Sequence, residues 1–326
     1  MNLYGIVGAA FLAGAIPSME YRPDRDGAQT RIGISVVDDL GDAVQDAKVY
    51  VKFFTTFEKF YIKEMTTDKG GYAECSGTTR GEVVVRIEKD HFYHTTSHVK
   101  YQDVSWDDAV ASRKWAKGVV ISKMKLKRIR DPQKKRLASV DMKKPPLTEK
   151  TVPFDILAAD WCAPYGKGRV NDINFNFCRE DATNYVAYTG MRMELPNCVD
   201  GLYAAEIEDW SKFRYCYAAN TNAIYSKCLE MGKLPENHPD ALVQSGCDQK
   251  RYHVIRFRTV TNEVGHIVSA RYGLILEGLD YSGGLSMAVQ VNIGENDINL
   301  EDESAERIMN KMKRRNRDNA PKPPIL

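Results

Sequence analysis

Short runs in which apolar and polar residues alternate recur along most of the chain. In residues 31–39, Ile32, Ile34 and Val36 share one face, which is the period of two typical of a half-buried strand. Turns such as residues 68–71 separate these runs, because glycine adopts positive φ without steric cost. Strands this short and closely spaced, with no helical segment between them, predict an antiparallel β-sandwich. Other apolar members of the pattern are Val49, Val51, Phe53, Val83, Val85 and Ile87.

The same alternation continues between residues 154 and 300. Ile173, Phe175 and Phe177 alternate with polar residues, and every second residue from Leu285 to Ile293 is apolar. We therefore predict an all-β protein whose second domain is an antiparallel β-sandwich or a jelly-roll-like domain.

We also expect one or two short helices. Helical spacing of apolar residues predicts the first at 221–231, with Gly232 as its cap, and the second near 303–315. The residues that would share a face are Ile224, Tyr225, Cys228 and Leu229 in the first, and Ala305, Ile308, Met309 and Met312 in the second.

The length of 326 residues suits two domains, each large enough to bury a core. The net charge is only +2, but residues 113–150 hold 14 Lys and Arg against 3 Asp and Glu. Four prolines interrupt the polar stretch 131–153, which predicts an interdomain linker. The predicted divisions are a leader at 1–19, a sandwich at 31–130, the linker at 131–153, a second β domain at 154–300, and a short helix with a basic tail at 301–326.

Three segments of the first domain resemble the carboxypeptidase regulatory-like, or transthyretin-like, domain over about residues 31–128. They are VVDDLGDAVQDAKVYV, TTDKGGYAEC and GEVVVRIEKDHFY. The resemblance implies a seven-stranded prealbumin-like or Ig-like sandwich that serves as an accessory module without catalysis. It carries no zinc ligands of a true carboxypeptidase. The matching residues are Asp39, Gly41, Val44, Ala47, Val49, Thr67, Asp68, Gly71 and Tyr72.

The second domain also carries a resemblance. The stretch from Asp160 to Gly168, DWCAPYGKG, and the segment 154–293 around it are similar to the second domain of secreted bacterial proteins of unknown function. That resemblance implies no activity.

The amino terminus suggests export. Residues 3–16 contain no charged side chain, and Ala13-Gly14-Ala15 provides small residues for a cleavage site. A run of about 14 residues is too short to span a bilayer, which needs roughly 20. The alternative is a buried element of the mature fold. We predict a signal peptide, and no membrane span after it.

Six of the seven cysteines fall between Cys162 and Cys247. None has the C-x-x-C spacing of a zinc site, so we predict no structural metal. In an oxidising compartment these cysteines permit up to three disulfides. The alternative is that they are reduced and buried.

No pattern predicts a catalytic residue, a metal site or a cofactor. His91, His94 and His98 lie after a strand in a Ser- and Thr-rich stretch, where a surface loop is the simpler interpretation. The turn 165–168 lacks the spacing of a phosphate-binding loop and precedes a strand. His238, His253 and His266 stand isolated, with no partner evident for a catalytic base.

Aromatic and basic residues offer the better binding hypotheses. Tryptophan faces can stack sugars, although core packing is the simpler explanation for them. The basic run 123–150 could bind phosphates, acidic glycan or other anionic envelope components, or be a solvated strand face. The basic tail 307–317 is either a docking segment or a frayed end. The tryptophans are Trp106, Trp115, Trp161 and Trp210.

We therefore predict an exported, non-catalytic binding or structural protein of the bacterial cell envelope. Its expected ligand is a glycan, an anionic envelope component or a partner protein, and nucleic acid is not expected for an exported protein. One alternative is a carbohydrate-active hydrolase that uses two carboxylates in the second domain. The other is a structural or assembly protein of a virus particle. The sequence leaves the ligand-binding residues and the oligomeric state open.

Overall fold

The computed structural model describes residues 21–302, except 56–58, 102–105, 147–150, 183–184, 208–210, 237 and 245. The chain divides into two compact units. Unit 1 comprises Met1–Ser35, Gln45–Arg86 and His98–Lys123. Unit 2 comprises Val36–Val44, Ile87–Ser97 and Met124–Leu326. The predicted signal peptide at 1–19 and the predicted helix at 303–315 lie outside the described residues.

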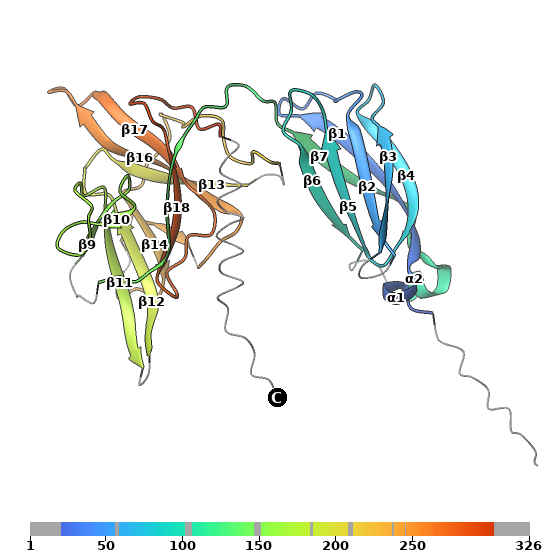
Figure 1. The fold of residues 1–326 in the computed structure, drawn as a ribbon, viewed down its shortest axis with the longest axis horizontal. Coiled ribbons are helices and arrows are strands. Elements are labelled where there is room, and N and C mark those ends of the chain that lie inside the picture. Colours follow the sequence, from blue (N-terminus) through green and yellow to red (C-terminus); the bar gives the residue numbers. More distant parts are fainter. Residues whose placement is uncertain are drawn as a thin grey trace, which may run out of the picture. The chain divides into compact units, whose positions relative to one another are not determined.

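The first seven strands form two sheets, and some of these strands run past the boundary of unit 1 (Figure 1). One sheet has the order β4-β1-β7, and the other has the order β3-β2-β5-β6. The predicted alternation is confirmed, because Val36, Val51 and Val85 are fully buried while both chain neighbours of each are partly or fully exposed. The bounds are β1 (Ala28–Asp38), β2 (Lys48–Phe54), β3 (Phe60–Thr66), β4 (Tyr72–Thr79), β5 (Glu82–Glu88), β6 (Thr95–Lys100) and β7 (Lys114–Leu126).

Unit 2 holds a six-stranded sheet of order β10-β9-β11-β12-β14-β15 and a five-stranded sheet of order β13-β16-β17-β18-β8. Among the described residues of these two sheets, neighbouring strands pair antiparallel except β14 with β15, which are parallel. The bounds are β8 (Arg136–Lys143), β9 (Val152–Asp155), β10 (Asp160–Trp161), β11 (Ile173–Ala182), β12 (Tyr185–Glu194), β13 (Gly201–Glu206), β14 (Cys228–Gly232), β15 (Leu242–Gln244), β16 (Arg251–Thr261), β17 (Ile267–Ile275) and β18 (Leu285–Val291).

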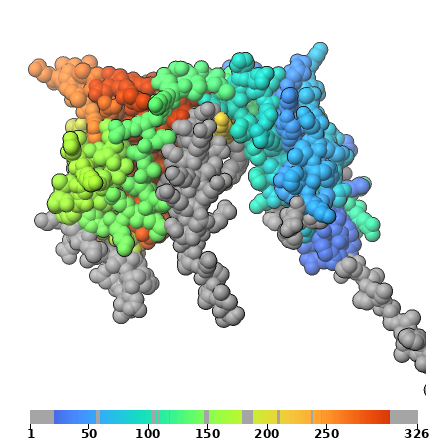
Figure 2. All heavy atoms as spheres, in the orientation of Figure 1, coloured from blue at the N-terminus to red at the C-terminus, as the bar shows by residue number. Residues whose placement is uncertain are grey.

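One apolar cluster joins the two sheets of unit 2. Phe175 and Met193 enter it from the six-stranded sheet, and Ile255 and Val289 enter it from the five-stranded sheet. Trp161 packs edge-on against Phe175, with ring centroids 5.6 Å apart, an arrangement that aromatic pairs favour. Figure 2 shows all heavy atoms as spheres, with those of each unit closely packed. The all-β prediction is confirmed.

The helix predicted at 221–231 is wrong. Strand β14 begins at Cys228 and pairs with β12, so that Met231 faces Met191. Leu229 and Met231 are buried in the sandwich core, whereas Ile224 is 94% exposed. The helical spacing was coincidental, because burial in the sheet determines the conformation here. The described helices are α1 (Pro23–Asp26) and α2 (Trp106–Ser112).

The stretch 131–153 is not only a connection between domains. It contains β8, which pairs with β18 at the edge of the five-stranded sheet of unit 2. Ala138 and Val140 are buried, and the burial of these apolar side chains favours a strand here despite the prolines and charges of the segment. The basic character sits on an edge strand, where lysines are common.

All seven cysteines are free thiols in the structure, so the disulfides expected from the sequence do not form in it. Strand register gives a physical reason for two of them. Cys178 lies opposite Gly190, and Cys228 lies opposite Glu194, so neither faces another cysteine across the sheet. Burial raises the pKa of the Cys228 thiol to about 11, which keeps it protonated and unreactive at neutral pH.

His253 on β16 makes unit 2 sensitive to acid. Its side chain is buried, and neither ring nitrogen has a hydrogen-bond partner among the described residues. Burial, helped by Arg251, lowers its pKa from 6.5 to about 4. The unfolded chain therefore takes up a proton below about pH 6.5 that the folded chain does not bind until about pH 4. Stability is lost as the pH falls through that window, by up to about 3 kcal/mol.

We predict that His253→Leu removes this loss. Its free energy of unfolding at pH 7 should stay within about 1 kcal/mol of wild type, because the imidazole makes no hydrogen bond there. Urea unfolding of both proteins between about pH 4 and pH 7 measures the difference. An equally steep acid dependence in the variant would contradict the assignment.

Candidate functional site

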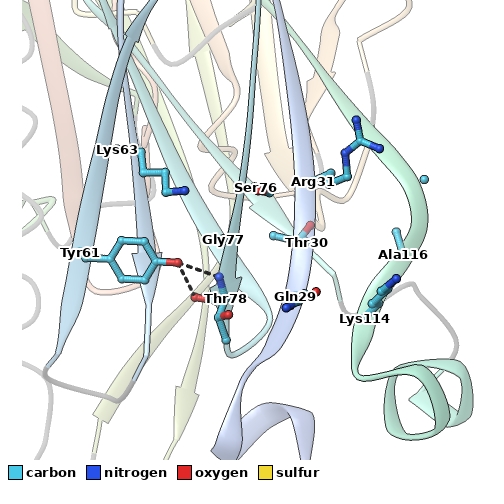
Figure 3. Close-up of a pocket in the computed structure, with 11 residues that line it drawn as sticks. Gln29, Thr30, Arg31, Tyr61, Lys63, Ser76, Gly77, Thr78, Lys114 and Ala116 are labelled. Carbon is cyan, nitrogen blue, oxygen red and sulfur yellow. Dashed lines mark hydrogen bonds between the residues drawn. The ribbon is translucent and has the colours of Figure 1, made fainter.

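A polar groove lies on unit 1, where β1, β3, β4 and β7 come together (Figure 3). Its volume is about 450 Å³, which is within the range of small-molecule sites. Tyr61 and Lys63 of β3 form one wall, and the beginning of β7 forms the other. The lining residues are Gln29, Thr30, Arg31, Tyr61, Lys63, Ser76, Gly77, Thr78, Lys114, Ala116 and Gly118.

Tyr61 anchors the wall formed by β3. Its ring stacks on Phe53, with centroids 5.1 Å apart. Its hydroxyl accepts a hydrogen bond from the backbone N–H of Thr78 at 2.7 Å, on β4 at the edge of its sheet. Gly77 allows this approach, because a Cβ there would lie 2.5 Å from Phe53 and 2.6 Å from the Tyr61 hydroxyl. Lys63 shares the face of Tyr61 by strand alternation and points into the groove (Figure 3).

Gly118 keeps the opposite wall open. A Cβ built at this position would have no atom within 4 Å, and the backbone there is not left-handed. Ala116 is the neighbouring lining residue on that strand, and it too is small. Larger side chains at these two positions would fill the groove.

The electrostatics of the groove are positive. The Arg31 guanidinium pairs with Glu74 at 2.5 Å, and the Tyr72 hydroxyl donates to the other oxygen of Glu74 at 2.8 Å. The Tyr72 hydrogen bond and then Arg31 lower the pKa of Glu74, which stays ionised and offsets Arg31. The ammonium groups of Lys63 and Lys114 have no hydrogen bond or ion pair within the described part of the chain. These two charges are available to a ligand.

The tryptophans do not form a binding face among the described residues. Trp115 is 3% exposed and donates from Nε1 to the carbonyl of Thr79 at 2.6 Å. Trp161 is 3% exposed in the core of unit 2, and Trp106 packs edge-on against Trp115. Trp210 lies outside the described residues. Core packing, the simpler of the two predictions, explains the two buried tryptophans.

The histidines of residues 91–98 do not converge. His91 sits in a turn with φ 66°, and His98 bonds through Nδ1 to Glu82 at 2.6 Å. The backbone carbonyl of His94 accepts from Lys212 at 2.9 Å. Within the described ranges, no group of three or more His, Cys, Asp or Glu side chains could hold a metal ion.

Two backbone N–H groups of the turn 165–168 already donate hydrogen bonds within the protein, so they are not available to a phosphate. The N–H of Lys167 donates to Asp160 at 3.0 Å, and that of Gly168 donates to the carbonyl of Trp161 at 2.9 Å. A Cβ at Gly166 would lie 2.3 Å from that same carbonyl. The segment is a tightly packed turn.

Three aspartates of unit 2 do come together, around Arg258. The guanidinium binds both oxygens of Asp172, at 2.7 and 2.8 Å, and one oxygen of Asp155 at 3.1 Å. Asp200 accepts the backbone N–H groups of Arg258 and Thr259, at 3.0 and 2.9 Å. These contacts hold a β-bulge in which Arg258 has φ 53°.

This cluster is built for stability and not for catalysis. Asp155, Asp172 and Asp200 are buried, and their carboxylate oxygens accept hydrogen bonds from the guanidinium or from backbone N–H groups. Burial raises the pKa of Asp172 despite Arg258, which shows how far the carboxylate is removed from water. The two carboxylates of a glycosidase must reach a substrate, and none of these three buried carboxylates does so.

No protein-family model matches the chain, and no curated protein matches it. The resemblance to the carboxypeptidase regulatory-like domain therefore stays a prediction. No described helix is long and apolar enough to cross a membrane.

Comparison with solved structures gives only weak likenesses. The 3-chlorocatechol 1,2-dioxygenase of Rhodococcus opacus 1CP is 15% identical over 39% of this chain and 72% of its own, with a TM-score of 0.26. BcpA, the major pilin subunit of Bacillus cereus, is 12% identical over 73% and 66%, with a TM-score of 0.23. A candidate carbohydrate binding protein of Bacteroides uniformis ATCC 8492 is 10% identical over 83% and 99%, with a TM-score of 0.20. These scores are too low to carry an argument.

Sequence reasoning did not single out the groove. Of its residues, only Lys114, Ala116 and Gly118 lie in the basic stretch 113–150 that drew attention. The polar positions Gln29 and Arg31 alternate with buried ones, but any solvated strand face gives that signal.

We predict that Asp172→Ala lowers the free energy of unfolding by about 3 kcal/mol, because it leaves Arg258 and the Ile156 amide without their buried acceptor. The control is Asp24→Ala, which removes an exposed pair with Arg22 and should stay within about 0.5 kcal/mol of wild type. Urea unfolding followed by circular dichroism measures both. A loss below about 1 kcal/mol for Asp172→Ala would show that the cluster is not a structural clamp.

Proposed function

We propose that the protein is a non-catalytic binding protein and that the groove of unit 1 is its ligand site. The observation that carries the proposal is the chemistry of the groove. It offers hydroxyls, an amide and two unpaired ammonium groups, on the rigid surface of a β-sandwich. It contains no carboxylate among its lining residues and therefore no acid–base pair for hydrolysis.

The ligand class that best fits this lining is a glycan. Gln29, Ser76 and Thr78 supply donors and acceptors that match sugar hydroxyls. An apolar small molecule is disfavoured, because such ligands need pockets lined mainly by hydrophobic and aromatic side chains. The carboxylate cluster around Arg258 does not support the hydrolase alternative, because its three aspartates are buried.

We also propose that the protein is exported to the cell envelope, where glycans are abundant. The apolar run 3–16 and the small residues at 13–15 motivate this. Free thiols on seven cysteines are compatible with export only if the compartment does not oxidise them, so disulfide formation in the native protein is part of the same test.

We predict that intact mass spectrometry of natively produced protein finds a chain shorter by about 15 to 20 residues. Alkylation before and after reduction would show which cysteines are oxidised. An uncut amino terminus with seven free thiols would contradict export and favour an intracellular or particle-borne protein.

We predict that Gly118→Trp abolishes glycan binding by the full chain, with at least a roughly tenfold loss of affinity. Gly118 lines the groove and a Cβ added there would have no atom within 4 Å, so the fold should be retained. The matched control is Val268→Trp, which adds the same side chain at a position of unit 2 that is 57% exposed.

The measurement is a glycan screen followed by calorimetric titration of the best ligand with wild type and both variants. Unchanged affinity for Gly118→Trp, or no glycan bound by wild type, would overturn the proposed site. Shortening of a bound oligosaccharide by the pure protein would overturn the assignment as non-catalytic.

A further inference from the structure

A second cavity continues the groove of unit 1. Its volume is about 460 Å³, and it is lined by the first described residues, by β1 and by the end of α2. Gln29 and Thr78 line both cavities, and they lie opposite each other in the register of β1 and β4. The two cavities therefore meet at this pair, which makes one extended groove with two halves.

The second half is lined by one carboxylate and one cation, Asp26 and Arg113. Asp26 is its acidic lining residue, and Arg25 pairs with that carboxylate at 2.8 Å. The hydrogen bond from Arg25, together with the backbone N–H of Arg22, lowers the pKa of Asp26 to about 2. The charge of Asp26 is offset by Arg25, as the charge of Arg31 in the first half is offset by Glu74. The remaining cations are Arg113 in the second half and Lys63 with Lys114 in the first.

The groove presents no free aromatic face. The ring of Tyr61 is stacked on Phe53, and the guanidinium of Arg113 lies 5.0 Å above the ring centroid of Tyr21. Single-stranded nucleic acids depend on stacking of bases on such faces, so the groove is poorly suited to them. Neutral sugars would also bind here without the affinity that stacking on an aromatic ring provides. Charge is then the main source of affinity that the groove can offer.

We infer that this extended groove binds an acidic oligosaccharide, with one anionic sugar in each half and the hydroxyls between them on Gln29 and Thr78. The inference rests on the proposed glycan-binding function and specifies its ligand class. Carboxylate, sulfate or phosphate groups would be bound by Lys63 and Lys114, which serve as point charges. The arginine side chain at 113 supplies the charge of the other half.

The test is calorimetric titration of the full chain with tetragalacturonate and with its methyl ester, which has the same backbone without the charge. We expect at least tenfold tighter binding of the acid form. The double variant Lys63→Gln/Lys114→Gln should lose roughly a hundredfold, about tenfold for each charge-assisted contact. The matched control is Lys48→Gln/Lys69→Gln, which removes two exposed lysines of unit 1 outside the groove and should bind like wild type.

The outcomes separate the two claims. Equal binding of acid and ester, still blocked by Gly118→Trp, would overturn the acidic ligand class and leave the proposed function standing. No binding of either form or of any screened glycan would overturn the proposed function itself. Binding of an oligothymidylate of equal charge as tightly as tetragalacturonate would overturn the glycan in favour of a general polyanion. Raising the salt from about 50 to about 500 mM should weaken only the acid form.

Discussion

The hydrogen bond between the Tyr61 hydroxyl and the Thr78 backbone links the edge strands of two sheets in unit 1. Strand β4 ends its sheet, and its outward N–H at Thr78 needs a partner. Tyr61 reaches it from the other sheet because Gly77 leaves room. Strand β3 pairs with β2 along its length, and the Tyr61 contact joins it to β4, with Lys63 lining the groove beside this contact. An inward-pointing charge on an edge strand also discourages pairing with other chains. Lys63 thus lies both on an edge strand and in the groove that we propose as the ligand site.

In unit 2, the two sheets cover each other through one continuous apolar cluster. Several polar side chains of unit 2 are buried, among them Asp155, Asp172, Asp200 and His253. The Arg258 cluster holds a bulge, and the unpartnered imidazole of His253 is kept neutral by burial. The Arg258 cluster stabilises the fold, whereas the buried imidazole of His253 lowers the stability of unit 2 in acid. Asp155, Asp172, Asp200 and His253 are buried, and the ligand site that we propose lies in unit 1.

Much of the fold could be predicted from the period of two, because burying one face of a strand forces that period on the sequence. Ile32, Val51 and Val85 lie on the buried face as their pattern indicates. The pattern failed at 221–231, where a few apolar residues fitted a helix by chance. It also failed at 131–153, where prolines and lysines concealed an edge strand. The groove could not be predicted, because strands distant in sequence supply its residues and an ordinary solvated face shows the same polar alternation.

The central claim is that ligand recognition takes place on the β1, β4 and β7 face of unit 1. Amide chemical-shift mapping of the full chain, titrated with tetragalacturonate, tests it most directly. The account predicts that the largest shifts centre on Gln29 and Thr78 and extend to Lys63 and Lys114. Largest shifts in unit 2, for example around Asp172 and Arg258, would contradict it.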